Sequence, residues 1–336
     1  KITGHTKEFN TNKDTGILGA AFVGSLSFAF TDSFWFNAVE TEVYAMATLI
    51  MAVMFYLGLR WEKEMHSPKG NRWLILISFI VGLSFGVHFM GLLTIPAIGL
   101  LYFFKNYKTI TPKNFIVANA TVVAILLFVF KLLAPNILRY FSVLEIFFVN
   151  TIGLPFNSGS IIAFIILTLS IYFGLNYSKR NGYIVFNTGL LCVTFIIIGF
   201  TTWLMLPIRA NANVPVNENN PSNARELLAY YNLEQYPKTH LFYGPQFTDQ
   251  YAGLDENQPY TDDKPKYEKD EKSGRYVIVN DYENAIQNYN SDHGSLLPRM
   301  WSGEHAENYM MYSGPLEFSI KSEYKMQNEF RSLVAN

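Results

Sequence analysis

The sequence predicts an all-α membrane domain that crosses the bilayer several times, followed by a smaller α+β region outside the membrane. Residues 17–207 are a series of apolar runs split by short basic loops, and several runs approach the ~20 apolar residues that a spanning helix needs. Residues 208–336 hold no run of that length and are rich in Asn, Tyr, Glu, Lys and Pro. We therefore expect a transmembrane domain at 1–207 and a soluble region at 208–336. The net charge of −1 gives no basis for binding nucleic acid by charge.

The apolar runs define the expected spans. Residues 73–104 are too long for one span at ~1.5 Å per residue, so we divide them near His88. Residues 135–150 are apolar but shorter and include Arg139 and Glu145, which favours a helix lying in the membrane interface. On the length criterion we expect about seven spans. They cover 17–36, 43–59, the two halves of 73–104, 114–133, 158–177 and 183–206.

The loop charges predict an orientation. Lys and Arg collect in alternate loops, at 60–72, 105–113 and 178–182. The connecting stretches expected on the other side are 37–42, 88–91 and 134–157, and among them only Arg139 is basic. This asymmetry places the basic loops in the cytoplasm and residues 208–336 outside. The low charge, the abundance of Asn, Tyr, Phe and Ile, and a single cysteine (Cys192), which excludes a disulfide within the chain, fit a bacterial inner membrane and a periplasmic soluble region.

Local patterns predict two elements of the soluble region. Asn220–Pro221 is typical of a helix start, with Asn at the cap and Pro in the first turn. Residues 265–280 are typical of a β-hairpin with its turn near Lys272–Gly274.

An acidic and aromatic stretch at 28–46 lies between the first two spans. Its carboxylates are Asp32, Glu40 and Glu42, and its rings include Trp35 and Tyr44. Acidic groups between membrane segments are costly to place and indicate function. In an extended turn, Glu40 and Glu42 would face the same side, and paired acids can act as a general base or hold a divalent cation. The alternative is a polar turn whose aromatic residues only anchor it at the interface.

Two further groups belong to the same expected outer face. His88 is the one histidine within an apolar run, where its alternative role is packing. Arg209, Asn211 and Asn213 follow the last span in the sequence IRANANVP and could bind a phosphate at headgroup depth. The alternative for Arg209 is a side chain that only snorkels to the interface.

The sequence lacks the common motifs for nucleotide binding, zinc binding and nucleophilic catalysis. There is no phosphate-binding P-loop, dinucleotide-binding glycine pattern, zinc-ligand spacing or nucleophile elbow. The sequence therefore predicts no metal site and no certain cofactor, and a need for a divalent metal stays open.

Several long stretches together resemble a known family. They are FTDSFWFNAVETEVYA (30–45), GLSFGVHFMGLLTIPA (82–97), LPIRANANVPVNENNP (206–221), LFYGP (241–245) and PRMWS (298–302). They are similar to a bacterial family of multi-pass membrane proteins that is related to eukaryotic protein O-mannosyltransferases of the endoplasmic reticulum. These enzymes belong to the glycosyltransferase-C class. The resemblance covers most of residues 17–302 and is weaker at 135–180 and 255–290.

The resemblance implies a glycosyltransferase-C-like fold and a polyprenyl-phosphate monosaccharide as sugar donor. An acidic residue would deprotonate a hydroxyl of an exported protein, which attacks the sugar carbon in one inverting displacement, and polyprenyl phosphate would leave. Asp32, Glu40 and Glu42 would orient the acceptor or assist the base. His88, Arg209 and Asn211 would lie on the donor-phosphate side, and Asn213, Trp35 and Tyr44 complete the expected substrate-binding set.

The chain departs from the family in one respect. Members carry a first acidic loop of the Asp-x-Gly-Glu-Phe type, and this sequence has none. The principal base is therefore unassigned, and we expect a fragment whose residues 208–336 precede further spans. Two other functions stay open: a non-catalytic subunit of a cell-envelope or secretion complex, and a lipid or solute transporter. The sugar, the acceptor and the oligomeric state are not predicted.

Overall fold

The computed structural model separates into two compact units, which we describe one at a time. One comprises Lys1–Leu144 with Ser160–Tyr231, and the other Glu145–Gly159 with Asn232–Asn336. The structure describes residues 11–40, 42–212, 214–234, 236, 240–248, 254–255, 257–291, 294–315, 318–319 and 334–335.

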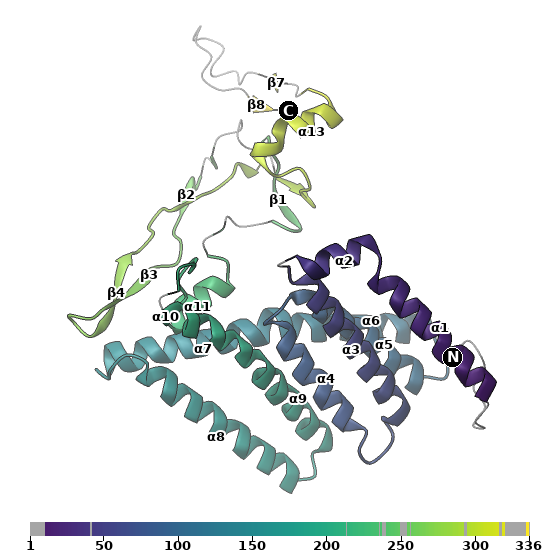
Figure 1. Ribbon diagram of the computed structural model, residues 1–336. Coiled ribbons are helices and arrows are strands. Elements are labelled where there is room, and N and C mark those ends of the chain that lie inside the picture. Colours follow the sequence, from purple (N-terminus) through teal and green to yellow (C-terminus); the bar gives the residue numbers. More distant parts are fainter. Residues whose placement is uncertain are drawn as a thin grey trace. The chain divides into compact units, whose positions relative to one another are not determined.

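The first unit is helical (Figure 1). Its α-helices are α1 (Thr11–Ala29), α2 (Asp32–Val39), α3 (Tyr44–Glu64), α4 (Asn71–Ser84), α5 (Thr94–Asn106), α6 (Pro112–Leu127), α7 (Ala134–Ile146), α8 (Ser158–Arg180), α9 (Ile184–Phe200), α10 (Met205–Asn211) and α11 (Ala224–Tyr231). Two 3-10 turns, η1 (Phe89–Leu93) and η4 (Thr201–Leu204), and a π-helical turn, η2 (Phe128–Leu133), join them.

The predicted multi-pass helical fold is confirmed. Among the described residues, five helices are long and apolar enough to cross a membrane. Lys13–Ala29 and Asp32–Val39, bent by 64° at their junction, make a sixth span if counted together, and Asn71–Ser84 is a shorter apolar helix. The described residues therefore hold five or six candidate spans where about seven were expected, because the helix in the first half of 73–104 has only 14 residues.

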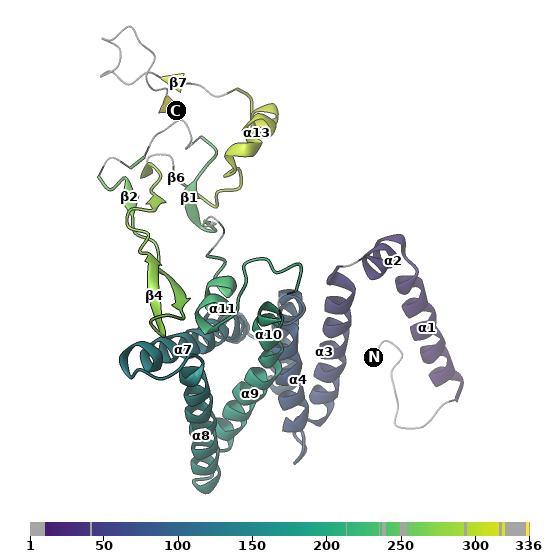
Figure 2. The ribbon, with the colours of Figure 1, turned by 60° about the vertical axis from the view of Figure 1, so that its left-hand side comes forward.

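One continuous helical segment is longer than the sequence predicted. Pro112–Thr151 forms 40 residues of helix, because η2 and the second π-turn, η3 (Phe147–Thr151), continue the path through α7. Figure 2 shows α7 crossing the end of α8 instead of running beside it. The interfacial position expected for residues 135–150 stays a prediction, and so does the domain boundary expected between residues 207 and 208.

The helices α4 and α9 pack with their backbones in close contact. A Cβ atom on Gly82 would overlap the carbonyl oxygen of Ile196, and one on Gly199 would overlap that of Phe79. Small residues allow such close backbone approach, which is how apolar helices associate where no hydrophobic driving force acts between them. This pair of glycines therefore fixes the position of two helices that are far apart in the sequence.

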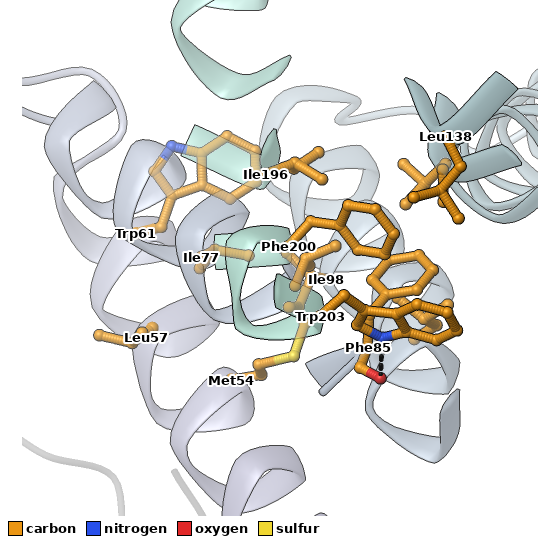
Figure 3. Close-up of a cluster of buried hydrophobic side chains, with 14 of the residues drawn as sticks. Met54, Leu57, Trp61, Ile77, Phe85, Ile98, Leu138, Ile196, Phe200 and Trp203 are labelled. Carbon is orange, nitrogen blue, oxygen red and sulfur yellow. Dashed lines mark hydrogen bonds between the residues drawn. The ribbon is translucent and has the colours of Figure 1, made fainter. Parts of the chain in front are cut away.

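A cluster of buried apolar side chains surrounds this contact (Figure 3). Its members come from six α-helices and from the turns η1, η2 and η4, and they include Met54, Leu57, Val81, Phe85, Ile98, Ile196, Phe200 and Trp203. The Trp203 indole Nε1–H donates to the carbonyl oxygen of Phe85 at 2.7 Å, the dashed line in Figure 3. Because Phe85 follows the last residue of α4, this bond satisfies a carbonyl that the helix end leaves without a helical partner.

At the opposite end of α3 and α4, charged side chains hold the loop that connects the two helices. Glu64 accepts hydrogen bonds from Arg60 at 3.0 Å, Arg72 at 2.8 Å and the Trp73 indole at 2.9 Å. Both guanidinium groups also lie 4.9 Å from the centre of the Trp73 ring. These cation–π and ionic contacts hold the loop between α3 and α4.

The second unit contains short antiparallel strand pairs. The pairs are β1 (Tyr243–Pro245) with β6 (Gly294–Leu296), β2 (Tyr260–Thr261) with β5 (Ile286–Gln287), β3 (Lys266–Asp270) with β4 (Arg275–Asn280), and β7 (Phe318–Ser319) with β8 (Val334–Ala335). A 3-10 turn, η6 (Gly303–His305), leads into α13 (Ala306–Ser313). The β3–β4 hairpin confirms the one predicted over 265–280, and Gly274 in its turn has a φ of +67°.

This hairpin is anchored on η3. The Asn150 side chain accepts from the Tyr276 amide at 2.9 Å and donates to the Tyr276 carbonyl at 2.8 Å, so it pairs with β4 as a neighbouring strand would. The Tyr276 hydroxyl donates to Glu145 Oε1 at 3.2 Å, and the Asn157 amide donates to the same oxygen at 2.6 Å. Glu145 is only 1% exposed, so these bonds compensate the cost of burying its carboxylate.

The α4–α9 contact predicts a position-dependent effect of one methyl group. Gly199→Ala would lower the stability of the protein by about 1–3 kcal/mol, because the new side chain meets rigid backbone. Gly189→Ala, on the same helix but with no atom near its Cβ position, would keep or raise stability. Thermal unfolding of both variants in detergent measures the difference, and equal effects would contradict the close approach.

The double hydrogen bond of Asn150 predicts local opening when its donor is removed. Asn150→Asp keeps the acceptor oxygen but brings a carboxylate against the Tyr276 carbonyl, so hydrogen exchange at the Tyr276 amide would accelerate about tenfold or more. Asn280→Asp is the matched control, because Asn280 only accepts, from the Tyr282 amide at 2.8 Å. An unchanged exchange rate in Asn150→Asp would show that this pairing does not hold the hairpin.

Candidate functional site

The predicted site residues of the first unit gather at one end of its helices. Tyr44 begins α3, and its ring lies 5.6 Å from the ring of His88, which follows α4. The bond from Trp203 to Phe85 brings the end of α9 to the same place. The start of α3, the end of α4 and the end of α9 therefore share one end, as the alternating loop charges predicted.

The acidic stretch contains a helix where a turn was expected. Thr31 is extended, and Asp32 begins α2, where a carboxylate interacts favourably with the positive end of the helix dipole. Glu40 is extended and follows the last residue of α2. Eight helical steps of ~1.5 Å separate Asp32 from Glu40, so they lie about 12 Å apart along the helix axis. The structure therefore does not bring Asp32 together with Glu40.

The acidic side chains are accessible. Asp32, Glu40 and Glu42 are all exposed, and within the described part of the chain none of their carboxylates takes part in a hydrogen bond or an ion pair. Trp35 is half exposed and stacks on Phe30, with ring centres 5.6 Å apart. The carboxylates are thus free to meet a substrate hydroxyl or a cation.

His88 has a defined hydrogen-bonding role. It precedes η1, and its Nδ1 accepts from the Met90 amide at 3.1 Å. Because Nδ1 is the acceptor, the proton of the neutral ring is assigned to Nε2, which remains available as a donor. The structure thus pairs two of the predicted substrate-binding residues, Tyr44 and His88, through their rings.

An apolar cavity of about 340 Å³ adjoins this pair. Met46 and Ile50 of α3 line one side, and Gly86 and Val87, immediately before His88, line the other. A side chain at Gly86 would press against Thr202, which also lines the cavity, so these two residues are in close contact. Because the lining is almost entirely apolar, the cavity suits a hydrocarbon chain.

The predicted phosphate-binding residues after the last span have different environments. Arg209 is exposed in the last turn of α10. The Asn211 side-chain amide donates to Pro207 and Ser222, both at 2.8 Å, so it ties α10 to the loop before α11. Asn213 lies outside the described residues.

Sequence reasoning missed an aromatic group that supports the site. Phe89, next to His88, meets Phe130 at 5.1 Å between ring centres. Phe130 lies in the π-turn η2, and its carbonyl accepts from the Tyr231 hydroxyl of α11 at 3.0 Å. Tyr231 also lies 5.2 Å from the Trp203 ring. The Asn220–Pro221 pattern predicted a helix start, but α11 begins at Ala224, and Asn223 caps it by accepting from the Arg225 and Glu226 amides. Nothing in the sequence indicated which surface this helix covers.

No metal centre is formed by the residues that the structure places. Among them, no three His, Cys, Asp or Glu side chains are grouped so that they could hold a metal ion.

Comparison with known proteins identifies two regions. Residues 1–111 match the family model of the protein O-mannosyl-transferase TMEM260 N-terminal domain. The predicted relation to eukaryotic O-mannosyltransferases is thereby confirmed for this part of the chain, which contains Asp32, Glu40, Glu42 and His88. Residues 237–330 match a family of unknown function (DUF8416). No curated protein matches the chain. No solved structure matches it either.

Burial of Tyr231 predicts a loss of stability in strong alkali. Burial raises the pKa of the Tyr231 phenol to about 12, above the usual value of about 10. Below pH 10 the phenol is neutral in both the folded and the unfolded chain, so the buried phenol makes its full contribution to folding stability there. Between about pH 10 and 12 only the unfolded chain ionises, so this contribution is lost as pH rises.

Unfolding of the protein and of Tyr231→Phe across pH 9–12 measures the effect. The wild type would lose more stability over this range than the variant, and phenolate absorbance would show one late-titrating tyrosine fewer in the variant. Identical pH profiles would contradict the burial of the phenol against Phe130.

Proposed function

We propose that the protein is a membrane glycosyltransferase that transfers a monosaccharide from a polyprenyl-phosphate donor to a hydroxyl group of an exported protein. The observation that carries this proposal is the match of residues 1–111 to an O-mannosyltransferase domain, because this region includes the exposed acidic stretch and His88. We place the reaction at the outer face of a bacterial inner membrane, with residues 208–336 in the periplasm, because the loop charges favour that orientation.

The cavity supports a lipid-linked donor. A polyprenyl chain is a hydrocarbon, and the space between Met46, Ile50 and Val87 offers apolar surface of matching chemistry. Its lining ends at the residue before His88, so a phosphate at the head of the chain would meet the Nε2–H of that ring. Exposed Arg209 supplies a positive charge on the same predicted face. Charge-assisted hydrogen bonds of this kind hold lipid phosphates.

The acidic stretch supports activation of the acceptor. In a single displacement, a carboxylate removes the proton from the acceptor hydroxyl while the hydroxyl oxygen bonds to the anomeric carbon of the sugar. The bond from that carbon to the phosphate oxygen breaks, and polyprenyl phosphate leaves with the electron pair. Attack from the side opposite the leaving group inverts the configuration. We assign acceptor orientation or base assistance to Glu40 and Glu42, and we leave the principal base unassigned.

Asp32 has a separate role in this scheme. Its position about 12 Å from Glu40 along α2 excludes a shared proton between these two carboxylates. Trp35, half exposed between them on the same helix, offers an apolar face for a sugar ring or an acceptor side chain.

Loss of both glutamates tests the enzyme. In membranes containing the full-length protein, transfer of radiolabelled sugar from polyprenyl-phosphate donors to envelope proteins would fall about 100-fold or more in the double variant Glu40→Gln/Glu42→Gln. Glu218→Gln, which removes an exposed carboxylate from the loop before α11, is the matched control and would keep the activity. Transfer that survives in the double variant would remove the acidic stretch from the site. No transfer from any donor by the folded wild type would overturn the proposed function.

A further inference from the structure

Three cations, Lys113, Lys131 and Arg139, lie in the longest helical segment among the described residues, and Lys131 is the one in its π-turn η2. Lys131 lies within the continuous segment Pro112–Thr151, which passes the criteria for a membrane span. Its side chain is exposed, and among the described residues no carboxylate lies within ion-pair distance of it. Its ammonium group lies over the Phe130 ring, whose centre is 4.9 Å from Nζ.

This environment leaves the charge only partly compensated. A cation–π contact stabilises an ammonium group from one side and does not neutralise it. Ionisable residues within membrane segments are rare, pair with an opposite charge and mark functional positions. No carboxylate among the described residues supplies that charge, and a lipid anion is the counter-ion that the surrounding bilayer offers.

The backbone at Lys131 is held in a special geometry. Lys131 lies in η2, and π-turns of this kind are frequent at functional sites. The neighbouring Phe130 carbonyl is fixed by the Tyr231 hydroxyl at 3.0 Å, so α11 holds this turn in place. The Phe130 ring in turn meets Phe89, which adjoins His88. The turn that carries Lys131 therefore packs against the element that carries a predicted phosphate-binding residue.

We propose that Lys131 binds the phosphate group of a membrane lipid. Phosphate is the anion that a bilayer offers at the depth of its headgroups, and an exposed lysine ammonium binds it as a point charge. Two sources share this chemistry, a polyprenyl phosphate and a bulk anionic phospholipid. The inference rests on the proposed function only where the lipid is the sugar donor.

Arg139 provides a matched control on the same helical segment. It is an exposed cation of α7, two turns beyond Lys131, and among the described residues it has no ion-pair partner either. It lies outside the π-turn. A variant at Arg139 removes the same charge from the same segment without touching the geometry that we assign to the site.

Lipid binding by the full-length protein in detergent tests the proposal. Native mass spectrometry would titrate the protein with undecaprenyl phosphate, phosphatidylglycerol or, as an uncharged reference, diacylglycerol. Lys131→Met would weaken binding of at least one phosphate lipid about five- to tenfold, while Lys131→Arg and Arg139→Met would keep it. Diacylglycerol binding would be equal in all variants, and thermal unfolding would confirm that each variant is folded.

The outcomes separate the two sources and the two proposals. A loss confined to undecaprenyl phosphate assigns Lys131 to a polyprenyl donor, and a loss confined to phosphatidylglycerol assigns it to a bulk lipid. Unchanged binding in Lys131→Met, or equal losses in Lys131→Met and Arg139→Met, would overturn the proposal in favour of snorkelling or unspecific surface charge. Since binding needs no sugar transfer, failure of the proposed enzyme activity would leave this result standing.

Discussion

The close approach of α4 and α9 at Gly82 and Gly199 is the constraint on which the first unit depends. In a bilayer, apolar side chains gain little from leaving lipid, so packing has to come from close contact between complementary backbones. Once these two helices touch, Trp203 reaches the carbonyl at the end of α4. That bond fixes the point where the chain turns into η1, and with it the position of His88. The cavity beside Gly86 and Thr202 follows from the same contact, because both residues lie just beyond the two glycines.

The candidate site combines three kinds of surface that a lipid-linked substrate would need. The cavity between α3 and α4 is apolar, His88 directly follows its lining residue Val87, and the acidic stretch beyond Tyr44 is exposed. The ring contact of Phe89 with Phe130 and the hydrogen bond from the Tyr231 hydroxyl to the Phe130 carbonyl hold these parts against α11. In the proposed reaction, the apolar part would take the lipid, the histidine its phosphate and the carboxylates the acceptor hydroxyl. Lys131 would add a second cation at the same end of the helices, and the roles of the cavity, His88 and the carboxylates would stay the same.

Local patterns predicted much of the secondary structure, because the physics that they report is local. The apolar runs correspond to helices, since backbone groups in lipid can be satisfied only within such a segment. The β3–β4 hairpin was predictable because Gly274 permits the positive φ that its turn requires. The local structure of the acidic stretch was more difficult to predict. Its mixed composition indicated a turn, whereas the structure contains α2, which separates Asp32 from Glu40. The π-turns η2 and η3 had no sequence pattern, because a single widened turn leaves the apolar composition of a helix unchanged.

The sequence by itself determined that the chain crosses a membrane repeatedly, which loops share a side, and which acidic and basic residues are costly enough to indicate function. Each of these properties depends on composition and on the order of segments along the chain. Only the tertiary structure decided that Tyr44 meets His88, that Asn211 ties a loop while Arg209 stays exposed, and that Asn150 completes the edge of a strand 126 residues away. These pairings depend on the angle and depth at which helices pack. Those quantities are set by contacts between distant glycines and aromatic rings, and no window of neighbouring residues encodes them.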